Sequence, residues 1–559
     1  MIRSGARSSV VAMTEQRRPT RIDAIAEGWV DTVARLDPVL AVYIGRESAG
    51  LPDLSPEGHD ELVREAASVR AALAAAEPVD QVDRVTAADL GGELDLVADS
   101  DAARLHLRDL NVIASPAQDI RQVIDLMPQE TAEDWDAVAE RLRAMPAAIA
   151  GYTETLRQGM REGVVPARRQ VEAVAELVDG YAAKFFAELP GGAPEALQGD
   201  VARASEGSAE AYRALASFLR TELLASVTET DAVGREAYAL HSRRFLGADI
   251  DLDEAYEWGA EELARMVDEQ ERTAREIVPG GSVADAIAAL DADPARKLDG
   301  VDALQRWMQE TSDRAVAELG ASHFDIPEPV RTLECLIAPT QDGGIYYTGP
   351  TDDFSRPGRM WWSVPPGDTE FTTWRELTTV YHEGVPGHHL QIATAVYQRG
   401  TLNSWRRLLA GTSGHAEGWA LYAERLMEEL GYLDDPGDRL GMLDAQRMRA
   451  ARVVLDLGVH LGKRNPEGEA WTFEYALEFF RSHVNISEAQ SRFEVQRYFG
   501  WPGQAPSYKI GQRLWEQLRD EVRTREGAAF DAKDYHRRVL ELGGLRLDTV
   551  RGALLGFDA

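Results

Sequence analysis

The sequence is poor in cysteine: Cys335 is the only one among 559 residues. A single thiol cannot form an intramolecular disulfide, so the fold does not depend on an oxidising compartment. The lack of cysteine also excludes a zinc site built from thiolates. Any metal ion must therefore be held by histidine and carboxylate side chains.

Long apolar runs and an excess of positive charge are also missing. No stretch of 18 uncharged apolar residues occurs, so we expect no membrane-spanning segment. The 94 acidic residues outnumber the 60 lysines and arginines, which gives a formal net charge of −34. Because so acidic a surface repels phosphate groups, we expect neither nucleic acid nor an anionic membrane as a partner.

Residues 1–20 contain four arginines but only a very short apolar run, Val10–Met13. A signal peptide needs a longer apolar segment and a cleavage site of small residues. We therefore expect residues 1–20 to be a disordered tail, with Met13 as a candidate start, and the protein to be cytoplasmic.

The pattern of apolar residues predicts a mainly α protein with one small sheet. Residues 21–330 are expected to form a helical domain that walls a cleft, with helices that include Leu252–Ile277 and one that begins after Ser55. Pro146 should end or kink another helix. Residues 331–559 are expected to form the second domain, in which short strands such as 333–338 and 358–365 precede further helices.

The densest cluster of polar chemistry contains four of the eleven histidines within 34 residues: His382, His388, His389 and His415. Its centre reads YHEGVPGHHLQ, residues 381–391. The familiar H-E-x-x-H motif places two imidazoles on one face of a helix, with the glutamate beside the first of them reaching the metal-bound water. Here Pro386 stands where that motif has its second histidine, so the motif is not matched.

His382 and His388 are six residues apart, which separates them by about 120° on an unbroken helix. They cannot share an ion from a regular helix, but Pro386 and Gly387 favour a break that returns His388 to the metal. The alternative second ligand is His389, which lies on nearly the same face as His382 but about 10 Å along the axis. We prefer His388 and keep His389 either as a side chain that supports the ligands from outside or as a substrate contact.

A catalytic zinc usually takes three protein ligands and leaves a fourth position for water. The helix expected from Ser413 onward supplies Glu417 as the third ligand, with His415 and Glu424 as rivals. Glu424 lies two turns from Glu417 on the same face, well placed to brace a ligand by a hydrogen bond.

The segments HEGVPGHHLQ (382–391) and EGWALYAE (417–424) resemble the DUF885 family of bacterial proteins. Supporting segments are YY (346–347), SRPG (355–358), RVVLDLGVH (452–460), and the stretch from RY (497–498) through PGQA (502–505) to SYKIG (507–511). The resemblance covers the last 230 residues strongly. It implies a zinc metallopeptidase with a large helical, zincin-like (oligopeptidase-like) architecture, in which a small β-sheet lies next to the active-site helix.

The resemblance also implies roles for individual residues. One Zn²⁺ per chain would be held by His382, His388 and Glu417, with Glu383 as general base. Tyr508, or alternatively His460, would donate a hydrogen bond to the tetrahedral intermediate. Arg356, within the SRPG segment, would contact substrate.

Residues Arg452, Asp456 and His460 follow an i, i+4, i+8 pattern, so that Asp456 can hold both neighbours. This pattern is either a charge ladder on a surface or a device that orients His460, with Arg452 or Lys509 left to bind a substrate carboxylate. The strand 358–365 is either an edge strand that pairs with the substrate backbone, as in zincin-like enzymes, or a core strand.

The resulting prediction is a zinc-dependent hydrolase, most simply a metallopeptidase that cleaves short peptides. Two alternatives remain open: a metal-dependent hydrolase of a non-peptide amide, and a non-catalytic peptide-binding protein on the same scaffold. The intact His382–Glu383 pair argues against the last. The first two require the same water, base and donor, so the sequence does not separate them.

Overall fold

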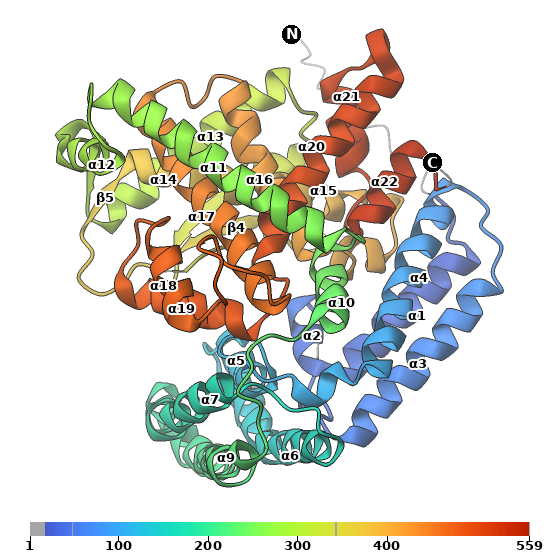
Figure 1. The fold of residues 1–559 in the computed structure, drawn as a ribbon. Helices are drawn as coiled ribbons and strands as arrows, with labels where there is room; N and C mark the ends of the chain where they lie inside the picture. Colours follow the sequence, from blue (N-terminus) through green and yellow to red (C-terminus); the bar gives the residue numbers. More distant parts are fainter. Residues whose placement is uncertain (1–16, 47, 341–343, 558–559) are drawn as a thin grey trace, which may run out of the picture.

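The computed structural model describes residues 17–46, 48–340 and 344–557, and these are mainly helical (Figure 1). The tail expected over residues 1–20 lies mostly outside the described residues. Residues 17–20 are described, and they pack against the helices that follow. The helices of the first half that precede residue 230 are α1 (Arg21–Leu36), α2 (Pro38–Tyr43), α3 (Pro56–Ala74), α4 (Gln81–Ala102), α5 (Pro116–Leu126), α6 (Ala132–Glu162), α7 (Arg168–Gly180), α8 (Phe186–Glu188) and α9 (Glu195–Thr221).

Helix α3 begins where the sequence indicates. Ser55 caps α3 by accepting a hydrogen bond from the backbone N–H of Gly58, and Pro56 occupies the first turn. The prediction that Pro146 ends a helix is wrong, and the alternative of a kink stays a prediction. Helix α6 continues through Pro146 to Glu162, and its apolar face packs against α9.

All but one of the remaining helices contribute to one large apolar core; the helix over residues 283–292 packs in a smaller cluster. They are α10 (Arg235–Leu246), α11 (Leu252–Ile277), α12 (Val283–Ala292), α13 (Val301–Ser322), α14 (Thr373–Glu383), α15 (His388–Tyr397), α16 (Ser413–Glu429), α17 (Pro436–His460), α18 (Phe473–Arg481), α19 (Glu488–Gly500), α20 (Pro506–Glu526), α21 (Ala532–Leu540) and α22 (Leu547–Leu555). Helix α11 packs along α17, and α16 along α20. Residues 235–324 therefore share their core with the C-terminal half, whereas the division expected at residue 330 stays a prediction.

Two small sheets lie beside α13 and α14. Strand β1 (Lys297–Asp299) pairs antiparallel with β5 (Glu370–Thr372). In the larger sheet, β4 (Gly358–Trp362) lies between β2 (Leu333–Ile337), to which it is parallel, and β3 (Ile345–Thr348), to which it is antiparallel. The edge-strand interpretation of residues 358–365 is therefore wrong: both sides of β4 are already paired, and Met360 and Trp362 pack in the core.

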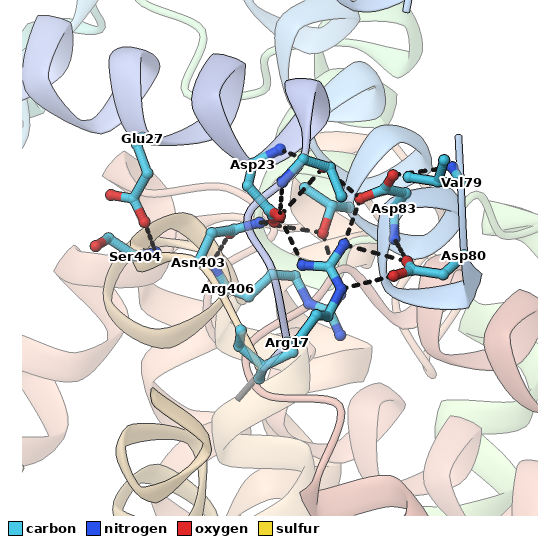
Figure 2. Close-up of polar contacts among 12 residues, drawn as sticks. Arg17, Asp23, Glu27, Val79, Asp80, Asp83, Asn403, Ser404 and Arg406 are labelled. Carbon is cyan, nitrogen blue, oxygen red and sulfur yellow. Dashed lines mark hydrogen bonds and ion pairs between the residues drawn. The ribbon is translucent and has the colours of Figure 1, made fainter. Parts of the chain in front are cut away.

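The N-terminal helices are fastened to the rest of the molecule by a buried polar cluster (Figure 2). Arg17 contacts Asp23 at 2.6 Å, Asp80 at 2.7 Å and Asp83 at 2.5 Å. Asn403, from the segment that follows α15, donates to the other oxygen of Asp23 at 3.0 Å. The cluster thus joins α1 and α4 to the chain that leaves the second histidine helix.

Among the helices described, none has the length and apolar character that crossing a membrane requires.

Candidate metal centre

The expected break between His382 and His388 is present. Helix α14 ends at Glu383, a cis Val385–Pro386 bond follows, and α15 begins at His388. The backbone folds back on itself here, since Gly387 donates from its N–H to the carbonyl oxygen of Tyr381. A Cβ on Gly387 would lie only 1.9 Å from the carbonyl oxygen of His382, so only glycine fits this close approach.

The fold-back brings the two imidazoles to one carboxylate. Oε2 of Glu417 lies 3.2 Å from Nε2 of His382 and 3.5 Å from Nε2 of His388. Two ligands of a tetrahedral zinc ion, each bound at about 2.1 Å, are separated by about 3.4 Å. The donor set and the spacing of His382, His388 and Glu417 therefore both fit a zinc ion.

Glu383 lies beside this triad. Its ligand atoms and those of His382 and His388 all lie within 4.8 Å of one another, so the carboxylate is a rival to Glu417 on distance alone. We assign the ligand role to Glu417 because one of its oxygens approaches both ring nitrogens. Glu383 is buried, its Oε2 has no hydrogen-bond partner, and burial raises the pKa of its carboxyl group. A free carboxylate with a raised pKa suits a general base.

The other ring nitrogen of His382, Nδ1, is bonded to a carboxylate on the side away from Glu417. Nδ1 donates to Oε1 of Glu424 at 2.8 Å, and Gln446 donates to the other oxygen of Glu424 at 3.2 Å. Lys509 continues the chain by donating to Gln446 at 2.6 Å. Glu424, one of the rival ligands, is thus a brace that fixes the tautomer and direction of His382.

The charges of the triad are coupled. Burial lowers the pKa of His382, but hydrogen bonds to Glu417 and Glu424 outweigh it and raise the pKa to about 10. For Glu417 burial acts in the upward direction, yet His388 and His382 hold the pKa of its carboxyl group well below its usual range. Glu417 is therefore ionised at neutral pH, the form in which a carboxylate binds a metal ion.

The other two candidate histidine ligands are engaged elsewhere. His389 donates from Nε2 to the carbonyl oxygen of Val330 at 2.7 Å and contacts the Tyr347 hydroxyl through Nδ1 at 2.9 Å. Both ring nitrogens are used, so His389 has none left for a substrate. His415 lies against Gln391, and burial lowers its pKa to about 4.

Tyr508 lies close to the triad. The charge of Glu417 adds to burial in raising its pKa, to about 12, so the hydroxyl is protonated at neutral pH. Among the described residues this hydroxyl has no hydrogen-bond partner, and its side chain is half-buried. Tyr508 thus offers a free donor beside Glu417.

Arg452 and Lys509 are not free to bind a substrate carboxylate. Arg452 donates to the Tyr498 hydroxyl at 2.7 Å and to Glu494 at 2.9 Å, and it stacks over the ring of Tyr508. Lys509 is 1% exposed, and it contacts Glu262 at 2.8 Å besides Gln446. Both side chains hold parts of the site together.

The expected ladder from Asp456 to its neighbours is not formed. Asp456 accepts hydrogen bonds from the Tyr238 hydroxyl at 2.7 Å and the backbone N–H of Gly503 at 3.0 Å. His460 donates to the carbonyl oxygen of Tyr498, and burial lowers its pKa to about 4. The neutral imidazole is therefore a packing element rather than a second donor.

The structure does not leave Arg356 free for the substrate contact that the resemblance implied. Its guanidinium donates to the carbonyl oxygens of Gly349, at 2.8 Å, and Pro357, at 3.1 Å. These bonds close the loop between β3 and β4. Arg356 shapes this loop.

The family assignment rests on the match along the chain. The profile of the family described as "Bacterial protein of unknown function (DUF885)" matches residues 38–554. The chain belongs to the DUF885 family. No curated protein matches it.

Two solved structures resemble this DUF885 chain. One is a protein from Colwellia psychrerythraea, provisionally described as a lipoprotein, with 21% identity and a TM-score of 0.82 over 96% of this chain and 98% of that one. The other, from Shewanella oneidensis, is provisionally described as a lipoprotein of unknown function, with 18% identity and a TM-score of 0.74 over 96% and 100% of the two chains. At these identities the likeness shows the fold alone.

Sequence reasoning overlooked two residues of this DUF885 site, Gln446 and Arg449, both on α17. Gln446 links Glu424 to Lys509. Arg449 lies three residues further on, so both point to the same side of the helix. The sequence could have indicated them, because Gln446, Arg449 and Arg452 follow one another at intervals of three residues on one side of α17.

Among the described residues, one other group has ligand-like spacing: His59, Asp101 and His106. Here the two rings stack at 3.5 Å with an interplanar angle of 17°. Lone pairs of parallel rings do not converge on one point, and Nε2 of His59 already contacts Asp101 at 3.0 Å. This group fits an ion less well than the triad.

Proposed function

We propose that this DUF885 protein is a zinc-dependent hydrolase that cleaves short peptides on a zincin-like, oligopeptidase-like helical scaffold. The observation that carries the proposal is the approach of one Glu417 oxygen to both Nε2 atoms of His382 and His388. The unpartnered oxygen of Glu383 beside them supports it.

The residues divide the chemistry among them. When bound by His382, His388 and Glu417, Zn²⁺ would supply a Lewis acid that polarises a carbonyl group and acidifies water. Glu383 takes the proton of the attacking water and passes it to the leaving amine. Tyr508 donates its O–H to the oxygen that becomes negatively charged. Glu424 accepts the Nδ1 proton of His382, which leaves the Nε2 atom of His382 as the one that would bind the ion.

The test measures metal content and hydrolysis together. We expect about one zinc per purified chain and hydrolysis of a panel of di- to hexapeptides that a chelator abolishes and zinc restores. Glu383→Gln should keep the metal and lose turnover by about 10³-fold or more. Glu376→Gln, on the same helix, is the control. Full activity of Glu383→Gln would remove the general base, and hydrolysis of small amides but not peptides would favour the amide hydrolase.

The second ligand is tested by two neighbouring variants. His388→Gln should lose the metal, whereas His389→Gln should retain it, because its ring nitrogens contact Val330 and Tyr347. Retained zinc in His388→Gln would contradict the triad. The expected cytoplasmic location and the absence of nucleic-acid and membrane partners stay predictions.

A further inference from the structure

Arg449 is a cation whose donors are largely unused. Its Nη1 makes one bond, of 3.3 Å, to the carbonyl oxygen of Ala445 one turn back on α17. Its Nε is buried without a partner, and among the described residues Arg449 forms no ion pair with a carboxylate. Since a guanidinium carries five N–H donors, most of its capacity is free.

The neighbouring arginines on α17 differ from it. Arg447 donates to Gln270 at 2.8 Å and to the carbonyl oxygen of Ser482 at 2.7 Å. Arg452 is held by Tyr498 and Glu494. A half-buried guanidinium without an anionic partner costs free energy that an incoming anion would recover.

Arg449 belongs to the row of α17 that faces the metal centre. Gln446, three residues before it, contacts Glu424, and Arg452, three residues after it, covers the ring of Tyr508. Residues three apart on a helix are neighbours, so Arg449 lies between the brace and the hydroxyl donor. Against the upward effect of burial, its charge lowers the pKa of Glu383 and Glu424.

The same side of the centre is the one that solvent reaches. His382 and His388 are buried, whereas Glu417, Tyr508 and Arg449 are all half-buried. A substrate that approaches Glu383 from solvent therefore meets Arg449 and Tyr508.

We propose that Arg449 binds the free C-terminal carboxylate of a peptide, which makes the protein a carboxypeptidase-like enzyme acting close to the C-terminus. The inference rests on the proposed peptidase function. Because Arg449 lies near both Glu383 and Tyr508 and one residue spans at most about 3.6 Å, the bound carboxylate lies within one or two residues of the scissile amide. An acidic side chain near that bond offers the same chemistry and is distinguished by the test.

The test compares trialanine with trialanine amide, which differ only at the C-terminus. We expect kcat/KM of the wild-type zinc protein to be at least 10-fold higher for the free acid. Arg449→Gln should remove this preference by raising KM for trialanine about 10- to 100-fold while leaving zinc content unchanged. Arg447→Gln, two residues away on the same helix, is the matched control and should behave as wild type.

Binding provides a readout that does not need turnover. In the Glu383→Gln background, calorimetry should show trialanine binding at least 10-fold more tightly than its amide, and adding Arg449→Gln should abolish the difference. Equal affinity or equal hydrolysis of acid and amide, or binding of neither, would overturn the inference. A preference for amides that carry an aspartate side chain would assign Arg449 to acidic side chains instead.

The two proposals fail in different ways. Chelator-sensitive hydrolysis without a C-terminal preference removes the role of Arg449 and leaves the peptidase. Hydrolysis that is indifferent to chelator and to Glu383→Gln contradicts the proposed zinc-dependent peptidase itself.

Discussion

At the scale of single residues, the candidate site contains two kinds of side chain: those with a free polar atom and those bonded to neighbouring side chains. Glu383 and Tyr508 have free oxygens, whereas Lys509 and Arg452 are held by neighbouring side chains. Free polar atoms next to a metal centre are costly unless a substrate uses them. This contrast gives each residue a distinct expected phenotype.

Tyr508→Phe should lower kcat about 10²- to 10³-fold, because removal of one oxyanion donor costs that much in comparable sites. KM and zinc content should change little, since the Tyr508 hydroxyl forms no hydrogen bond with any of the proposed metal ligands. Steady-state kinetics with elemental analysis measures both. Tyr256→Phe is the control: Tyr256 lies on α11, and its hydroxyl donates to the carbonyl oxygen of Arg464. Unchanged kcat in Tyr508→Phe would leave the intermediate without a donor from this residue.

Glu424→Gln should weaken zinc binding by about 10- to 100-fold, because an amide orients and polarises His382 less than a carboxylate does. Competition with a zinc chelator of known affinity measures the loss. Glu428→Gln, one turn further along α16, should bind zinc as wild type. Equal affinity in both variants would mean that His382 needs no brace.

At the scale of elements, the connection between α14 and α15 decides whether a site exists. Gly387→Ala places a Cβ 1.9 Å from a backbone oxygen that cannot move aside independently. We expect loss of bound zinc and destabilisation by more than about 2 kcal/mol. Zinc content and thermal unfolding check this. Gly400→Ala has open space around its Cβ and should be neutral. A stable, zinc-replete Gly387→Ala would refute the fold-back.

Features that depend on neighbouring residues were predicted well from the sequence. Features that depend on contacts between distant parts of the chain were predicted poorly. Helix α11 covers Leu252–Ile277 as its periodicity indicates, and Pro386 with Gly387 marked the break before His388. The central position of β4 depends on pairing with two other strands, which its own sequence does not encode. Lys509 looked like a free cation because its partner Glu262 lies 247 residues away. Burial of this kind follows from packing, not from spacing.

At the scale of the whole molecule, the N-terminal helices are held to the C-terminal half through buried charges. Asp23 and Asp83 are buried, and Arg17 contacts both (Figure 2). The same cluster reaches Asn403, downstream of α15, so the first helices and the histidine helix share one support.

Arg17→Ala should destabilise this junction by about 3–5 kcal/mol, because it removes the ion-pair partner of two buried carboxylates. Hydrogen exchange should rise in α1 and in the first turn of α4 before the core of α17 exchanges. The exposed neighbour Arg18→Ala should have little effect. Uniform exchange across the molecule would show that the cluster is not a local fastening.

Acid should destabilise the whole fold in a window set by buried neutral histidines. Burial lowers the pKa of His536 from 6.5 to about 3, and its Nε2 contacts the Tyr422 hydroxyl at 2.7 Å. The unfolded chain therefore takes up a proton that the folded one refuses. The resulting stability is complete above pH 6.5 and is lost as the pH falls toward 3. Urea unfolding at half-unit pH steps should show this decline, and His536→Gln should flatten it by a few kcal/mol at its acid end. A curve of equal slope in the variant would mean that protons enter elsewhere, because glutamine cannot titrate while it still offers Tyr422 an acceptor.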